Sequence, residues 1–225
     1  MKLYKLNKTV LSAYPNPALF LSGLTANTLD QPKNAFLNIH GRIIAVFEQA
    51  KIDDEEFWMI LETPFVEPLL NHLDRYLKLS KVQVKPLDKH VYFNLEDELP
   101  PLTKACLMIP QNKGQIVVSD IIHPVKVSDQ EFTLFRLRNH IPIQGVDYTD
   151  EFVLNIDDHG LVSYTKGCFL GQEPVAKVHN RSKPTWRLVA VYEDQCDAVM
   201  RDKMTSKTLD PVTNRMLGFT FKRND

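Results

Sequence analysis

The segment KGCFLGQE, residues 166–173, decides how this chain is interpreted. It places the thiol of Cys168 between two glycines, which allow backbone angles and close approaches that a Cβ would forbid. Lys166 and a helix predicted to begin with Pro174 as its first residue both favour the thiolate over the thiol. Two interpretations are open from these residues alone: a reactive thiol on a tight, partly exposed turn, or a small core cysteine in a turn that its glycines shape.

The composition of the whole chain is that of an ordinary globular protein. Of its 225 residues 44% are hydrophobic and 24% charged, and the net charge is −1. This balance gives no argument for nucleic acid or an anionic membrane as partner. The three cysteines form no C-x-x-C pair, which argues against a disulfide framework and against a self-contained metal site. Because no apolar run is long enough for a membrane span or a signal peptide, the sequence predicts a cytoplasmic protein.

Hydrophobic patterning along the chain predicts a mixed α+β fold. A helix is expected over residues 65–79, with Thr63 as its N-cap. The S-x-x-E capping box at 128–131 predicts a second helix that ends before Pro142. Short apolar runs bounded by turn residues predict strands at 18–21, 36–37, 43–47, 57–61, 82–84, 91–93, 105–109 and 116–118.

The order of these elements suggests how the chain is organised. Strand, helix, strand and strand follow one another within about fifty residues from Phe57, which predicts half of a split β-α-β arrangement. The acidic, proline-containing stretch 96–101 is expected to be a boundary. Alternating apolar residues at 188–192 and 217–221 predict a small all-β unit at the end of the chain.

Several common site motifs are missing from the sequence. It contains neither a P-loop nor a G-x-G-x-x-G fingerprint, and neither H-E-x-x-H nor G-x-S-x-G. The seven histidines include no pair at i, i+4. The sequence therefore predicts no nucleotide fingerprint site and no metal site.

The segment 166–173 resembles the signature of the YgfZ-type folate-binding proteins, relatives of the glycine-cleavage T-protein that are associated with iron–sulfur cluster assembly and repair. The resemblance covers most of the chain and is weakest between about 50 and 130. Further segments that are similar to parts of this family are 19–30, 36–43, 136–145, 152–187, 204–206 and 217–219.

The resemblance implies a cloverleaf of three units around a central hole that holds a reduced folate. These would be an aminomethyltransferase-like folate-binding domain over 1–48 and 105–185, an inserted ferredoxin-like unit over 49–104, and a shortened C-terminal β-barrel over 186–225. The implied cofactor is tetrahydrofolate or a derivative. The implied partners are iron–sulfur enzymes or cluster-assembly proteins, with tRNA modification as an associated process and no direct contact with nucleic acid or membrane.

The resemblance also implies the residues of the site. Cys168 would be the functional thiol. A folate needs acceptors at the donor edge of its pterin and cations near its glutamate tail. Gln172 and Glu173 either meet the pterin edge or cap the following helix. The residues expected to bind folate are Asn27, Asn38, Arg42, Arg136, Lys166, Gln172, Glu173 and Lys177.

Other functions stay open at this stage. The main alternative is a folate-dependent aminomethyl transferase, which is disfavoured because residues 60–70 contain no counterpart of the aspartate that assists transfer in the T-protein. A cysteine enzyme with His159 or His179 as its base is a further option. So is an interaction protein without a working folate site. His140, where the family usually has glycine, is expected to alter the loop that faces the site.

Overall fold

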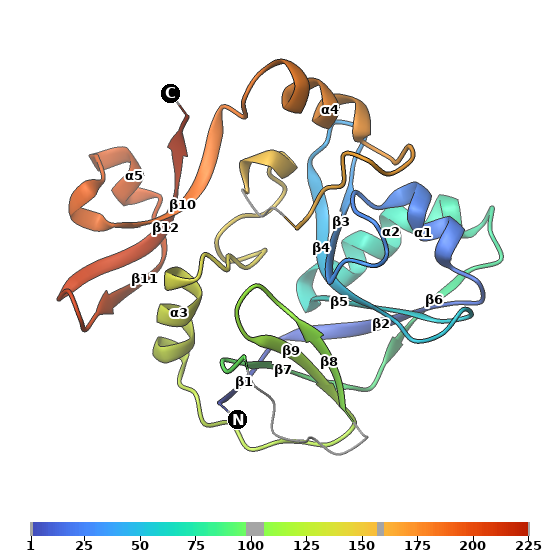
Figure 1. Cartoon of the computed structure of the whole chain (residues 1–225), viewed down its shortest axis with the longest axis horizontal. Coiled ribbons are helices and arrows are strands. Elements are labelled where there is room, and N and C mark those ends of the chain that lie inside the picture. Colours follow the sequence, from blue (N-terminus) through green and yellow to red (C-terminus); the bar gives the residue numbers. More distant parts are fainter. Residues whose placement is uncertain (1, 98–105, 157–159, 225) are drawn as a thin grey trace.

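The computed structural model describes residues 2–97, 106–156 and 160–224, and Figure 1 shows their arrangement. Three antiparallel sheets have the strand orders β3-β4-β5-β2-β6, β1-β7-β9-β8 and β10-β12-β11. The strands are β1 (Leu3–Lys5), β2 (Lys8–Tyr14), β3 (Lys33–Leu37), β4 (Ile43–Lys51), β5 (Phe57–Glu62), β6 (Gln83–Leu87), β7 (His90–Asn94), β8 (Cys106–Pro110), β9 (Gln115–Ser119), β10 (Trp186–Tyr192), β11 (Thr205–Asp210) and β12 (Arg215–Arg223). The helices are α1 (Ala18–Leu24), α2 (Val66–Leu77), α3 (Asp129–Arg138), α4 (Gln172–Arg181) and α5 (Ala198–Asp202).

The five-stranded sheet is buried on both faces. Side chains alternate along a strand, so neighbouring residues of β2 enter different cores. Leu11 packs with α1 and α2 on one face. Val10 packs on the other face with apolar residues of β7, β9 and α3. This sheet is therefore the layer that joins the two helices α1 and α2 to the four-stranded sheet and α3.

Helix α3 begins where the sequence predicts. The Ser128 hydroxyl oxygen accepts a hydrogen bond from the Glu131 backbone N–H at 3.2 Å, which confirms the capping-box prediction. Arg136 is buried, whereas the side chain of Arg138 is 43% exposed. Residues two positions apart on a helix face different ways, and these two arginines follow that rule.

Two other local predictions hold, one of them with a correction at its start. Strands β3 and β4 are joined at Gly41, which has a φ of +73°. Helix α2 occupies most of the range 65–79, but Thr63 does not cap it, because a 3-10 turn over Thr63–Phe65 precedes the helix.

The strand predicted at 18–21 is wrong, since these residues begin helix α1. Leu21 and Leu24, three positions apart, are the buried residues of this helix. A run of four apolar residues fits a buried strand as well as one face of a short helix, so periodicity alone cannot separate the two.

The split β-α-β arrangement does not form as one sheet. Strands β5 and β6 both belong to the five-stranded sheet, whereas β7 pairs with β1 and β9 in the four-stranded sheet. Part of the predicted boundary 96–101 lies outside the described residues. The division of the chain at residues 48 and 104 stays a prediction.

The C-terminal part is an open sheet, which corrects the expectation of a shortened barrel. Only β10, β12 and β11 form it, and no sheet in the described ranges closes on itself. Three strands are too few to close a barrel, whose diameter depends on the strand number. Within the described residues, no helix has the length and apolar character that a membrane crossing requires.

Candidate functional site

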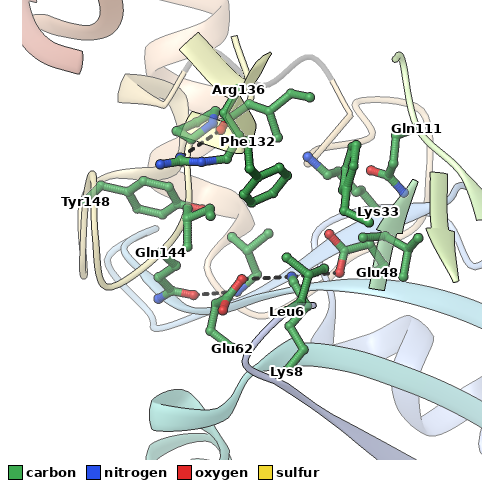
Figure 2. Close-up of a pocket in the computed structure, with 16 residues that line it drawn as sticks. Leu6, Lys8, Lys33, Glu48, Glu62, Gln111, Phe132, Arg136, Gln144 and Tyr148 are labelled. Carbon is green, nitrogen blue, oxygen red and sulfur yellow. Dashed lines mark hydrogen bonds and ion pairs between the residues drawn. The ribbon is translucent and has the colours of Figure 1, made fainter. Parts of the chain in front are cut away.

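A pocket opens between the five-stranded sheet, α3 and the segment 141–148 (Figure 2). Its cavity volume is about 40 Å³, well below the roughly 300–1,000 Å³ of ordinary small-molecule sites, so the pocket is a narrow cleft in this structure. One half of its lining is apolar. The polar lining residues are Lys8, Lys33, Glu48, Glu62, Gln111, Arg136, Gln144 and Tyr148.

A buried charge cluster, formed by Lys8, Glu48 and Glu62, covers the sheet side of the pocket. The Lys8 Nζ lies 2.9 Å from a Glu48 oxygen and 3.0 Å from a Glu62 oxygen. Burial alone would lower the pKa of Lys8, but attraction to the two carboxylates raises it above its ordinary value. Burial raises the pKa of Glu62 although Lys8 acts in the opposite direction. With two carboxylates and one ammonium, the cluster presents hydrogen-bond acceptors to a ligand.

Arg136 lines the opposite side of the pocket and is held by the C-terminal sheet. Its Nη1 donates to Asp147 Oδ2 at 2.7 Å, and its Nη2 donates to the Ser206 hydroxyl at 2.8 Å. Asp147 Oδ1 in turn accepts hydrogen bonds from Thr205 and Ser206 of β11. The Nε of Arg136 is buried and has no hydrogen-bond partner among the described residues. A buried donor without a partner is costly, so a ligand acceptor that reached this N–H would stabilise it.

Cys168 is exposed in the thiol loop, which we define as residues 163–170. Next to this loop, Gly171 has a φ of +83°, and a Cβ on it would overlap the backbone oxygen of Asn38. Gly171 therefore allows the chain to cross the β3–β4 turn at close range. Helix α4 begins at Gln172, so Pro174 is its third residue and not its first.

Lys166 does not line the pocket, and its side chain reaches the end of α1. Its Nζ donates to the backbone oxygens of Ser22, Thr25 and Asn27 at 3.0, 2.7 and 2.9 Å. An ammonium has three N–H donors, and all three are used here. Burial lowers the pKa of Lys166 to about 8.

Most of the other predicted folate-binding residues lie in turns or on α4. The buried Asn27 donates through Nδ2 to Gly160 O at 2.6 Å. Asn38 Oδ1 accepts from the backbone N–H groups of His40 and Arg42 and so shapes the β3–β4 turn. The side chain of Arg42 is 45% exposed and lies 3.5 Å from Asp150.

Among the predicted folate-binding residues, only Arg136 lines the pocket. Gln172, Glu173 and Lys177 belong to α4, and none of them contributes to the pocket lining. Sequence reasoning missed Lys8, Glu48 and Glu62, which lie at the start of β2, within β4 and at the end of β5. The proposed base His179 stacks on Tyr164, with ring centroids 3.6 Å apart. His159 lies outside the described residues.

Comparison with known proteins places this geometry in context. No family model matches the chain. It is 23% identical over 198 residues to "Iron-sulfur cluster assembly factor IBA57 homolog, mitochondrial" of Pyricularia oryzae, covering 74% of this chain and 50% of that protein. The protein of the same description from Mycosarcoma maydis is 25% identical over 198 residues, with 75% and 49% covered. An uncharacterized protein of Haemophilus influenzae is 23% identical over 147 residues, with 63% and 52% covered.

The chain spans about half the length of these curated relatives. Among solved structures, glycine cleavage system aminomethyltransferase T from Bartonella henselae matches with a TM-score of 0.68 at 12% identity, over 98% of this chain and 78% of that one. The chain therefore has the fold of aminomethyltransferase T. Its sequence is similar to those of the two IBA57 homologues, which confirms the resemblance to the YgfZ-type family.

Proposed function

We propose that this chain binds a reduced folate in the pocket and assists iron–sulfur cluster assembly or repair through Cys168. Two curated relatives that match about three quarters of the chain are described as iron–sulfur cluster assembly factors. The single observation that carries the folate part is the pair of opposed ligand groups in the pocket: the unpaired Nε of Arg136 and the buried carboxylate of Glu62.

The polar groups of the pocket match those of a folate, and the cleft, of about 40 Å³, would have to widen to admit the ligand. The pterin offers N–H donors along one edge, and the carboxylates of Glu48 and Glu62 are acceptors. The cation for an anionic or carbonyl group of the ligand would be Arg136, through its free N–H. When bound, a reduced folate would supply a carrier for one-carbon units. The apolar half of the lining would exclude water from the ring.

Cys168 supplies the second half of the proposal. It is exposed, as a thiol must be if it is to react with, or bind to, a group on another protein. The partners that we propose are iron–sulfur enzymes or cluster-assembly proteins. The cytoplasmic location stays a prediction.

One observation keeps the aminomethyl transferase as a second candidate. Glu62 lies in the segment 60–70, where the sequence shows no aspartate, and its carboxylate reaches the pocket with a raised pKa. A carboxylate with a raised pKa suits general acid–base chemistry. Glu67, the other glutamate near it, is exposed. Formation of methylenetetrahydrofolate from an aminomethylated carrier protein, lost in a Glu62→Gln variant, would support this candidate.

The thiol is tested in cells that lack their own YgfZ-type protein. We expect expression of this chain to restore aconitase activity, and we expect the Cys168→Ser variant to leave it at the level of the empty vector. Oxygen in place of sulfur removes the soft, nucleophilic ligand with little change in volume. The matched control is Cys106→Ser, since Cys106 is only partly exposed. Full restoration by Cys168→Ser would contradict the role of the thiol.

A further inference from the structure

The thiol loop is attached to the segment that ends α1 at both of its ends. The backbone N–H of Ser163 donates to Ala26 O at 2.9 Å, and that of Leu170 donates to Gly23 O at 3.1 Å. Among the six residues between these two bonds, Phe169 alone makes a backbone hydrogen bond to a helix or strand in the described part of the chain, accepting from the Gln172 N–H at the start of α4 at 3.2 Å. Figure 1 shows this loop passing α1 before it turns back into α4. The backbone of Cys168 itself makes none of these bonds, so the position of its exposed thiol depends on how the neighbouring residues are held.

Lys166 is the side chain that fixes the middle of this loop. Its three hydrogen bonds reach carbonyl oxygens at and just beyond the C-terminus of α1, where helix carbonyls lack intrahelical partners and a cation is favoured. Its Nζ also lies 5.4 Å from the centroid of the buried Phe169 ring. A cation at this distance attracts the ring. Lys166 and Phe169, which flank Gly167 and Cys168, are thus held by these contacts, whereas Gly167 and Cys168 are exposed.

We propose that Lys166 is a positioning residue for Cys168: its ammonium donates hydrogen bonds to the carbonyl oxygens at the end of α1 and so fixes the direction in which the thiol is presented. This inference rests on the proposed function only in treating Cys168 as the functional thiol. It gives Lys166 a role other than folate binding. The side chain is absent from the pocket lining, and its three donors are already used.

The test compares Lys166→Met, which keeps the length of the side chain but removes its donors, with Lys166→Arg, which keeps charge and donors. Amide hydrogen exchange is followed at pH 6.5 without folate or partner. We expect exchange of the Ser163 and Leu170 amides, which are hydrogen-bonded to the segment that ends α1, to rise about tenfold or more in Lys166→Met, since charge-assisted hydrogen bonds are lost. Lys166→Arg is expected to restore part of the protection. The control is Lys177→Met, on the exposed face of α4.

Three results would overturn the proposal. The first is unchanged exchange of the loop in Lys166→Met. The second is a uniform rise in exchange over the whole chain, which would indicate general destabilisation. The third is a fall in tetrahydrofolate affinity with unchanged loop exchange, which would make Lys166 a ligand. Since the exchange measurement needs no folate, failure of the chain to bind folate would leave the positioning role standing and would count against the proposed function alone.

Discussion

Replacing Lys8 by Met is expected to lower the free energy of unfolding by about 3–5 kcal/mol, because it leaves two buried carboxylates without their cation. Lys8 pairs with both Glu48 and Glu62. Removal of one member of a buried ion cluster costs more than the whole cluster contributes, since the remaining charges stay desolvated. Urea denaturation at pH 7 measures the change.

The origin of this loss can be checked in two ways. The matched control, Lys5→Met, changes an exposed lysine of β1 and should shift stability by no more than about 0.5 kcal/mol. Changing both Glu48 and Glu62 to Gln in the Lys8→Met background should recover part of the loss. Burial raises the pKa of Glu62. A raised carboxyl pKa stabilises the fold at low pH and loses that effect as pH rises, so the variant should be least impaired near pH 5. A Lys8→Met protein as stable as the wild type would show that the cluster is solvated.

Replacing Gly171 by Ala is the second change with a large expected effect. A non-glycine residue at a φ of +83° costs about 1–3 kcal/mol in backbone strain alone. The new Cβ would also overlap the backbone oxygen of Asn38, which cannot rotate away. We therefore expect loss of stability, displacement of the β3–β4 turn and lower activity of the thiol in cells.

Gly167→Ala is the matched control, since it lies four residues away on the other side of Cys168. No atom lies within 4 Å of the position that a Cβ would take on Gly167. Its variant should unfold within about 0.5 kcal/mol of the wild type. Equal effects of the two substitutions in urea denaturation would contradict the close approach at Gly171.

Local sequence signals predicted local structure well. The capping box at Ser128 acts within one helical turn, and Gly41 acts within one β-turn, so both could be predicted from neighbouring residues. His140 is a further local signal, because the residue type usual at its position indicates the backbone conformation. The family usually has glycine there, and His140 adopts a φ of +54°, a conformation that glycine reaches without strain.

The pocket depends on contacts that no local pattern encodes. Lys8 and Glu62 face each other because β2 and β5 pair in that register, and Glu48 joins them from β4. A shift of one residue in either strand would move these side chains to the other face. The family resemblance pointed to Arg136, but Ser206, which accepts a hydrogen bond from it, lies 70 residues further along the chain.

The contacts of Lys166, which was expected to bind folate, could not be predicted from the sequence for the same reason. Its place in the signature motif suggested a ligand, whereas its three acceptors are backbone oxygens about 140 residues earlier in the sequence. Backbone carbonyls exist at every residue and leave no trace in the side-chain sequence. Only the path of the thiol loop past α1 reveals them.

Titration of purified protein with tetrahydrofolate by calorimetry tests the central claim most directly. We predict saturable binding of one folate per chain, weakened about tenfold or more by Glu62→Gln, which removes a charged acceptor from the pocket. The control Arg42→Ala should bind like the wild type, because Arg42 is exposed and does not line the pocket. Absence of binding at millimolar folate, or equal affinity of the wild-type and Glu62→Gln proteins, would contradict the account.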